Sequence, residues 1–239
     1  MRFYYIRHGQ SINNALYDST GKSDGRNEDP ELTVVGHQQA RLLARFIRAK
    51  DVEAADHNLA LKRDYFGFTH LYTSLTMRSV QTGVAMAEAL QIPLVGWPEI
   101  HETGGIYLED PASGELKGLP GKTRSFFQEN YPKLVLPESL TEEGWWNRPY
   151  ESYEERQSRA KTVLQTLLAR HGGTDDRVAI ISHGGFYVQL MRQIFDMKGE
   201  NIWFLLSNTG ISRIDFETVG SADLIYHNRT DHLPDRLLT

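Results

Sequence analysis

The sequence predicts an α/β fold, specifically a three-layer αβα sandwich with a mostly parallel central sheet. Short apolar runs that suit buried strands alternate with longer segments of helical periodicity, the pattern of strands joined by covering helices. The run from Val178 to Ser182 shows no polar alternation, as expected for a strand covered on both faces. A length of 239 residues, 40% of them hydrophobic, is sufficient for one large core. We therefore expect a single domain spanning residues 1–239.

The predicted strands are short runs rich in apolar or aromatic residues. The first, Phe3-Tyr4-Tyr5-Ile6, lies at the start of the sequence. The last three follow one another without a helical segment between them, so we expect them to add antiparallel edges. The runs are residues 3–6, 68–73, 92–100, 178–182, 203–206, 210–216 and 224–226.

The predicted helices carry apolar residues at intervals of three, four and seven. After Thr33, a predicted N-cap, Ala40, Leu43 and Ile47 mark one buried face. The next helix places Arg78 in its first turn. The predicted helices are a segment that begins after residue 33 and the ranges 74–90, 154–171 and 186–195. Residues 17–31 are polar and rich in Gly and Asp, which predicts a loop.

Residues 103–150 interrupt this alternation. The segment is rich in glycine and holds most of the prolines of the chain, which indicates irregular structure. We interpret it as an insertion that covers the active site, and we expect it to determine substrate choice because long loops over a rigid sheet commonly do so.

Composition excludes several functions. A formal net charge of −5 is unfavourable for nonspecific nucleic-acid binding, which requires clustered positive charge. No apolar run approaches the roughly 20 residues that span a bilayer, and no signal-peptide core follows the N-terminus, so we expect a cytoplasmic protein with no membrane partner. The absence of cysteine excludes disulfides, thiolate catalysis and cysteine-ligated zinc.

Candidate functional residues follow three of the predicted strands. Arg7-His8-Gly9-Gln10-Ser11 follows the first, Arg78 lies after the second, and Ser182-His183-Gly184-Gly185 ends the strand near residue 180. Ligands of open α/β sheets bind beyond the carboxyl ends of the strands. Arginine offers permanently charged, forked donors that match phosphate oxygens, and histidine can act as nucleophile or as charged donor. The set predicts a site for a phosphate dianion.

Four motifs in one order make the chain resemble the histidine phosphatase (phosphoglycerate mutase-like) superfamily, and within it the phosphatase branch. The resemblance covers residues 1–102 and about 177–190 well and the insertion weakly. The motifs are Arg7-His8-Gly9 with Ser11 and Asn14, Leu32-Thr33 with Gly36 and Gln39-Ala40, Arg78 with Gln81-Thr82, and Ser182-His183-Gly184-Gly185.

The resemblance implies a phosphohistidine mechanism with His8 as the nucleophile. It also implies that Arg7, Asn14, Arg78 and His183 hold the phosphoryl oxygens, and we expect Ser11 and Gly184 to complete the substrate-binding set. Two neighbouring guanidinium groups would disfavour protonation of His8 and keep its lone pair available. Facing a phosphate dianion, His183 would donate a charge-assisted hydrogen bond.

The resemblance also implies a carboxyl group that protonates the leaving oxygen and then activates water. Glu102 is the expected residue and Glu99 the alternative. We expect neither a cofactor nor a metal, because the seven histidines other than His8 and His183 show no paired ligand spacing.

Three functions are open at this point. A phosphomonoester hydrolase is favoured over a phosphoglycerate mutase, because mutases of this family typically carry an Asn-Glu-Arg-His-Tyr-Gly-like stretch at the acid and a consecutive basic pair in the insertion. This chain has Glu102-Thr103-Gly104 and isolated basic residues. A noncatalytic phosphate-binding protein would be favoured by loss of His8 or of the acid, and both are present.

The expected partner is a small phosphorylated substrate of unspecified identity. Aromatic residues of the insertion would line an apolar pocket or bury the insertion on the sheet, and Arg124 and Arg148 are candidates for meeting a second anionic group. The sequence is compatible with a homodimer.

Overall fold

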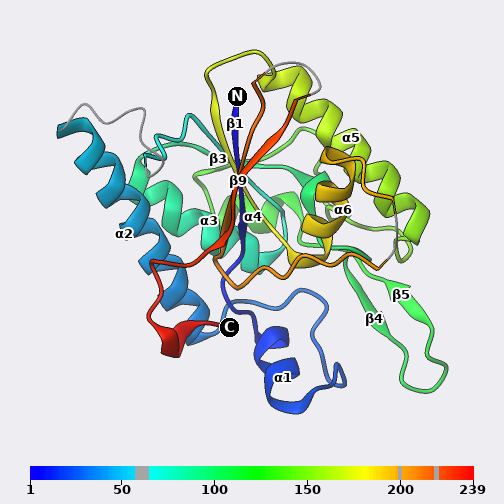
Figure 1. Ribbon diagram of the computed structural model, residues 1–239. Coiled ribbons are helices and arrows are strands. Elements are labelled where there is room, and N and C mark those ends of the chain that lie inside the picture. The colour runs from blue at the N-terminus through cyan, green and yellow to red at the C-terminus, as the bar shows by residue number, and fades with distance from the viewer. Residues whose placement is uncertain (57–64, 199–200, 218–220) are drawn as a thin grey trace.

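The computed structural model describes residues 1–56, 65–198, 201–217 and 221–239, and it has the predicted αβα layers (Figure 1). The described strands of the central sheet lie in the order β6-β3-β2-β7-β1-β8-β9. They are β1 Arg2–Arg7, β2 His70–Thr73, β3 Leu94–Gly96, β6 Leu134–Val135, β7 Arg177–Ser182, β8 Ile211–Asp215 and β9 Asp223–Arg229.

The pairing of these strands brings the predicted site together. β6, β3, β2, β7 and β1 pair in parallel, whereas β8 and β9 form the expected antiparallel edge. Arg7 at the end of β1 lies beside Ser182 at the end of β7, and Thr73 at the end of β2 lies beside Ile181. The loops that carry His8, Arg78 and His183 therefore leave one edge of the sheet.

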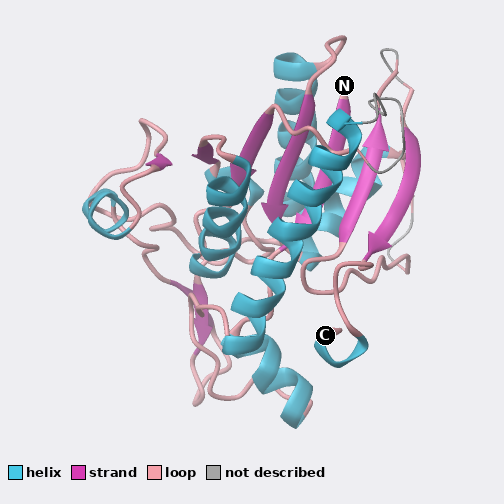
Figure 2. Ribbon diagram, turned by 90° about the vertical axis from the view of Figure 1, so that its left-hand side faces the viewer, coloured by secondary structure: helices cyan, strands magenta, loops and turns pink. Residues whose placement is uncertain are grey.

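Helices cover both faces of the sheet. α2 (Val34–Asp56) and α3 (Met77–Leu90) pack on one face, and α5 (Tyr153–His171) and α6 (Gly184–Ile194) pack on the other (Figure 2). The alternation of β1 serves both cores: Tyr4 and Ile6 belong to the first, and Phe3 and Tyr5 to the second. All four are fully buried, which is why this strand is apolar and aromatic throughout.

The residues at the N-cap positions of α2 and α3 behave differently. The Thr33 hydroxyl accepts a hydrogen bond from the backbone N–H of Gly36 at 3.0 Å and caps α2, as expected. Thr76 occupies the N-cap position of α3, but its side chain makes no capping bond. Its hydroxyl lies 3.3 Å from Nε2 of His183. The residue at the N-cap position of α3 therefore contacts His183.

The predicted loop over residues 17–31 was partly wrong, because α1 (Ile12–Thr20) occupies its beginning. Ser11 and Asn14 form a capping box, and Gly21 ends the helix with a left-handed backbone at φ 67°. None of the residues of α1 is buried, so it lacks the apolar stripe by which helices are recognised. In Figure 1, α1 projects below the end of β1.

The strand predicted at residues 92–100 is shorter than expected, and the strand predicted at residues 203–206 does not form. Of residues 92–100 only β3 pairs, because Pro98–Ile100 forms a 3₁₀ turn. Residues 203–206 form no strand. The backbone there binds side chains instead, since the carbonyl of Leu206 accepts from Nη1 of Arg7 at 2.5 Å. A further 3₁₀ turn, Asp235–Leu237, lies near the C-terminus.

The segment 103–150 contains a hairpin of β4 (Tyr107–Glu109) and β5 (Leu116–Gly118), the helix α4 (Arg124–Asn130) and β6. β6 extends the central sheet by pairing with β3, and Phe127 of α4 is fully buried in the first core. The hairpin projects at the same end of the molecule as α1 (Figure 1). No helix among the described residues is long and apolar enough to cross a membrane.

Candidate active site

His8 lies directly after β1 and is 3% exposed. Its Nδ1 lies 2.6 Å from the carbonyl oxygen of Gly9, which can only accept, so Nδ1 carries the proton. Nε2 accepts a hydrogen bond from Nε of Arg78 at 3.1 Å. Burial, reinforced by the charges of Arg78 and Arg7, holds the pKa of His8 well below its usual value. His8 is therefore neutral, with its lone pair on Nε2.

The two predicted arginines flank this nitrogen. Arg78 lies in the first turn of α3, where its Nη1 is 3.9 Å from Oδ1 of Asp29. Arg7 is the last residue of β1, and its buried Nε has no hydrogen-bond partner among the described residues. Burial lowers the pKa of both guanidinium groups, but arginine stays charged in proteins. The pocket therefore presents two desolvated cations to an anion.

Asn14 and Ser11 belong to one capping arrangement. Oδ1 of Asn14 accepts from the N–H of Ser11 at 3.1 Å and from Nδ2 of Asn208 at 3.3 Å. The Ser11 hydroxyl donates to the same Oδ1 at 3.0 Å. Because Oδ1 is occupied, Nδ2 is the group of Asn14 that remains available to an anion. Ser11 lines the pocket, but its hydroxyl serves the helix cap.

His183 is completely buried behind His8, and the centroids of the two rings are 5.0 Å apart. Its Nε2 lies 3.0 Å from the Ser74 hydroxyl, and its Nδ1 has no partner in the described structure. Burial, with the charge of Arg78, holds the pKa of His183 well below its usual value. His183 is neutral here, so only an anion in the pocket would favour the predicted imidazolium form.

Glu102 enters the pocket from the start of the insertion. Its Oε1 accepts from the backbone N–H groups of Thr103 at 2.8 Å and Phe186 at 3.0 Å, and its Oε2 accepts from the N–H of Gly185 at 3.2 Å. The carboxylate therefore sits on the N-terminus of α6, where helix N–H groups favour anions. Glu99, the alternative acid, is exposed and does not line this pocket.

These side chains enclose a polar cavity of about 160 Å³. Of the predicted site residues, Arg7, His8, Ser11, Asn14, Arg78 and Glu102 line it, whereas His183 and Gly184 lie behind the wall. A larger groove of about 670 Å³ lies between α3 and β6, but it is lined mainly by apolar residues and contains no histidine or arginine. The chemistry is therefore at the smaller cavity.

Comparison with known proteins agrees with this arrangement. The family model for the histidine phosphatase superfamily (branch 1) matches residues 3–228. The chain belongs to that superfamily. This confirms the predicted family, the α/β fold and the predicted class of enzyme, a histidine-type phosphatase.

Curated relatives include both phosphatases and mutases. A putative phosphoserine phosphatase 2 from Hydrogenobacter thermophilus is 27% identical over 97% of each chain. A probable phosphoglycerate mutase GpmB from Yersinia enterocolitica is 25% identical, covering 91% of this chain and 86% of the relative. Among solved structures, phosphoserine phosphatase from Entamoeba histolytica with 3-phosphoglyceric acid has a TM-score of 0.58 at 19% identity, covering 98% of this chain and 99% of the other.

Two contributors to this histidine phosphatase site were not predicted. Nδ2 of Asn208 donates to the carbonyl of His8 at 3.0 Å, which fixes the backbone of His8. Oδ1 of Asp29 accepts from the N–H of Met77 at 2.9 Å at the start of α3, and burial raises the pKa of Asp29 to about 6. Asp29 lies in the polar segment read as a loop, and Asn208 follows a predicted strand that does not form, so neither had a distinguishing pattern.

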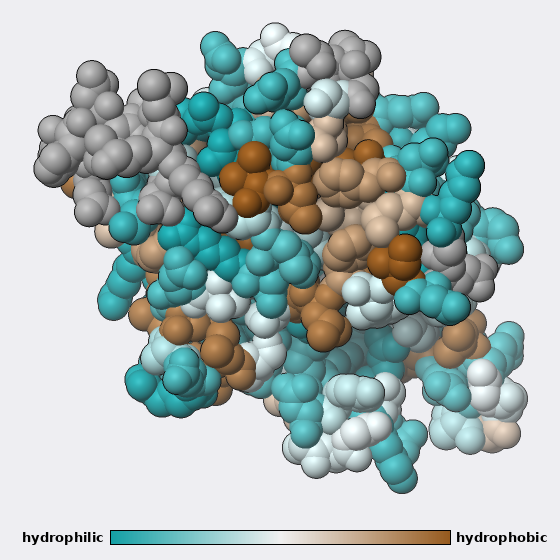
Figure 3. All heavy atoms as spheres, in the orientation of Figure 1, coloured by the Kyte–Doolittle hydropathy of each residue, from teal (hydrophilic) through white to brown (hydrophobic). Residues whose placement is uncertain are grey.

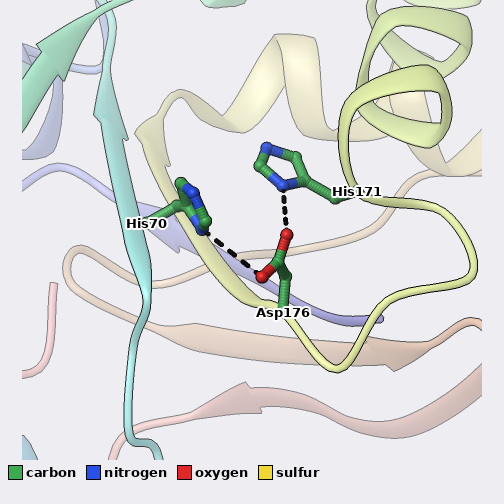
Figure 4. A group of neighbouring side chains, drawn as sticks. All are labelled: His70, His171 and Asp176. Atoms are coloured by element: carbon green, nitrogen blue, oxygen red, sulfur yellow. Dashed lines mark hydrogen bonds and ion pairs between the residues drawn. The ribbon is translucent and has the colours of Figure 1, made fainter.

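A cluster of metal-ligand residues lies elsewhere in the histidine phosphatase. His70, His171 and Asp176 meet at the opposite end of the parallel strands, with Nδ1 of His171 2.8 Å from Oδ2 of Asp176 and Nδ1 of His70 3.9 Å from Oδ1 (Figure 4). Their positions are too far apart in sequence for a spacing rule to reveal. His57 lies outside the described residues. The expectation that catalysis uses no metal stays a prediction.

Proposed function

We propose that this protein is a phosphomonoester hydrolase that transfers the phosphoryl group of its substrate to Nε2 of His8 and then to water. The observation that carries this proposal is the state of His8: it is buried, neutral, and has its lone pair on the nitrogen that faces the cationic pocket. A nucleophilic histidine must be neutral at the attacking nitrogen.

In the first step, Nε2 bonds to phosphorus as the bond to the ester oxygen breaks. Arg7 and Arg78 neutralise the phosphoryl oxygens, and Nδ2 of Asn14 donates to one of them. The Arg78 hydrogen bond to Nε2 must break for attack, which frees that N–H for a phosphoryl oxygen. The imidazole leaves the step as a phosphohistidine whose Nδ1–H still donates to the Gly9 carbonyl.

Glu102 serves both steps. In its protonated form it gives a proton to the leaving ester oxygen, and as a carboxylate it then takes a proton from the water that attacks phosphorus. The P–N bond breaks, phosphate leaves, and His8 returns to its neutral form. Glu102 is the sole carboxyl group among the described residues that line the pocket, which supports this role over Glu99.

The mutase alternative is less well supported. None of the basic residues of the insertion lines the pocket within the described part of the chain. Arg124 donates to the carbonyls of Leu140 at 2.8 Å and Pro137 at 2.6 Å, and Arg148 stacks on Trp146 at 4.1 Å. Both arginines therefore hold the insertion together. The presence of His8 and Glu102 in one cavity counts against a noncatalytic role. The cytoplasmic location and the homodimer stay predictions.

The test is hydrolysis of p-nitrophenyl phosphate with excess chelator by the wild type and His8→Ala, with a parallel mutase assay on 3-phosphoglycerate. We expect chelator-resistant hydrolysis that His8→Ala abolishes, and an acid-labile phosphoryl label on the wild type alone. Strong mutase activity without hydrolysis would favour the mutase. Unchanged hydrolysis by His8→Ala would exclude the phosphohistidine mechanism.

A further inference from the structure

A third guanidinium reaches the catalytic cavity from a segment that the mechanism does not use. Arg26 lies in the polar segment after α1 and lines the cavity together with Arg7, Arg78 and Glu102. Figure 3 shows hydrophilic side chains over this lower end of the molecule, where α1 lies. Arg26 therefore shares the space into which a bound substrate would extend beyond its phosphoryl group.

Two contacts hold Arg26 in place. Nδ2 of Asn13 donates to the carbonyl of Asn27 at 2.7 Å, and Oδ1 of Asn13 accepts from the N–H of Asn27 at 2.9 Å, which ties the loop to α1. The guanidinium of Arg26 lies 4.2 Å from the centroid of the Tyr107 ring, at the start of β4. Arg26 thus bridges the loop and the insertion at the cavity.

Arg26 has no direct acidic partner in the described part of the chain. No acidic side chain of the described residues forms an ion pair with it, and its buried Nε has no hydrogen-bond partner in that part of the chain. The pKa of Arg78 is lowered chiefly by burial, and the charge of Arg26 adds to that lowering. The single carboxylate of the cavity, Glu102, is bound to the N-terminus of α6.

Charge matching then decides what the cavity accepts. In the first step Glu102 carries its proton and is neutral, so a phosphomonoester dianion is met by Arg7 and Arg78 and Arg26 is a surplus cation. A guanidinium fork matches the two oxygens of a carboxylate. The cavity of about 160 Å³ is smaller than the roughly 300 Å³ at which pockets for drug-sized ligands begin, which suits a substrate with a short leaving group.

We infer that Arg26 binds a carboxylate on the leaving group of the substrate, so that the substrate class is small phosphomonoesters of hydroxy acids or amino acids. This inference rests on the proposed phosphatase activity and states which substrates that activity prefers. Arg26 would discriminate substrates by a contact remote from phosphorus, while His8, Arg7 and Arg78 act on the phosphoryl group common to all of them.

Matched substrates test the inference. Phosphoserine is compared with phosphoethanolamine, and 3-phosphoglycerate with glycerol 3-phosphate, because each pair differs mainly in the carboxylate. The variants are Arg26→Met, which keeps an unbranched side chain over Tyr107 without the charge, and Arg26→Lys, which keeps the charge. Lys22→Met is the control, since Lys22 is exposed on the same loop and does not line the cavity.

We expect the wild type and Lys22→Met to prefer the carboxylate member of each pair. Arg26→Met should lower kcat/KM for that member by roughly 10- to 100-fold, as for loss of a charged hydrogen bond, and for its partner by less than about threefold. Arg26→Lys should retain part of the preference. Circular dichroism of each variant establishes that it is folded.

The contrary outcomes are distinct. An equal loss on both members of a pair would mean that Arg26 binds the transferred phosphoryl group, and the inference would fail. Hydrolysis of p-nitrophenyl phosphate by the wild type without any preference within the pairs would overturn the inference and leave the proposed function intact. A wild type that hydrolyses none of these esters, p-nitrophenyl phosphate included, would overturn both.

Discussion

Nε of Arg78 donates a hydrogen bond to Nε2 of His8 at a distance of 3.1 Å, so a permanently charged group contacts the nitrogen that we propose attacks phosphorus. The contact has two effects. The N–H occupies the position that a proton on Nε2 would take, and the positive charge disfavours the imidazolium form. One arginine therefore keeps the nucleophile unprotonated and stands ready for the phosphoryl oxygens.

This arrangement predicts the pH dependence of hydrolysis. Protonation inactivates His8, and its pKa is held well below the usual value by burial and by Arg78 and Arg7, so the wild type should stay active on the acid side of pH 6.5. Arg78→Met removes one of the lowering charges, so the pKa of His8 rises and the acid limb of kcat/KM moves to higher pH. We also expect kcat to fall by about 10²- to 10³-fold.

The measurement is the pH profile of kcat/KM for p-nitrophenyl phosphate, whose own ionisation is common to all variants, with Lys22→Met as the control. An acid limb that stays in place while kcat falls would show that Arg78 acts on the phosphoryl group without tuning His8.

Glu102 and Glu99 offer a second test, because they lie three positions apart and only one faces the cavity. Glu102→Gln should lower kcat/KM for an alkyl phosphate by about 10²- to 10⁴-fold, since an alkoxide needs a proton to leave. For p-nitrophenyl phosphate, kcat/KM should fall much less, because nitrophenolate leaves without a proton and the later attack of water on phosphohistidine does not enter kcat/KM. Glu99→Gln should match the wild type on both. If kcat/KM falls equally for the two substrates in Glu102→Gln, Glu102 does not protonate the leaving group.

The site could largely be predicted from the sequence because its residues follow strands. Strand ends are marked by local apolar patterns, and parallel pairing brings the following residues together. Arg7, His8 and Arg78 met in one cavity for this reason. His183 was placed correctly beside His8, but its position behind the cavity wall depends on the Ser74 hydroxyl, which a spacing pattern does not reveal.

Arg26 illustrates what the sequence could not show. Its segment has no periodicity, and its position depends on backbone hydrogen bonds to Asn13 and on the ring of Tyr107, which is 81 positions away (107 − 26). Leu205 shows the opposite case, in which a local pattern predicted structure that does not form. Its apolar side chain contributed to a predicted strand, yet it is 75% exposed and pairs with no other strand in the described structure.

A third prediction concerns the adjacent glycines Gly184 and Gly185. An added Cβ at Gly185 would lie 2.5 Å from Oε1 of Glu102 and 2.6 Å from the Thr103 hydroxyl, whereas an added Cβ at Gly184 would come no closer than 3.8 Å, to Nε of Arg7. Gly185→Ala should therefore displace the Glu102 carboxylate and slow alkyl phosphate hydrolysis by roughly tenfold or more. Gly184→Ala should stay within about threefold, because its Cβ fits. Steady-state kinetics on folded variants decide this, and equal effects at the two positions would refute it.

Arg159 of α5 links the core to the segment around Glu102, the proposed general acid, without lining the cavity. Its Nη1 donates to the carbonyls of Glu99 at 2.7 Å and His101 at 3.0 Å, and its Nη2 donates to Glu151 at 2.8 Å. Glu151 in turn accepts from the N–H of Gly104 at 3.2 Å. Arg159 thus fixes the backbone on both sides of Glu102, which makes it a positioning residue.

Arg159→Lys retains the charge but cannot make the same set of bonds, since an ammonium lacks the guanidinium fork. We expect the alkyl-to-aryl ratio of kcat/KM values to fall by about tenfold, because in the transfer to His8 a misplaced Glu102 affects only the substrate whose leaving group needs a proton. Lys161→Arg, at an exposed position of the same helix, is the control and should keep the wild-type ratio. A lower Tm in Arg159→Lys with an unchanged ratio would show that Arg159 stabilises the fold without positioning the acid.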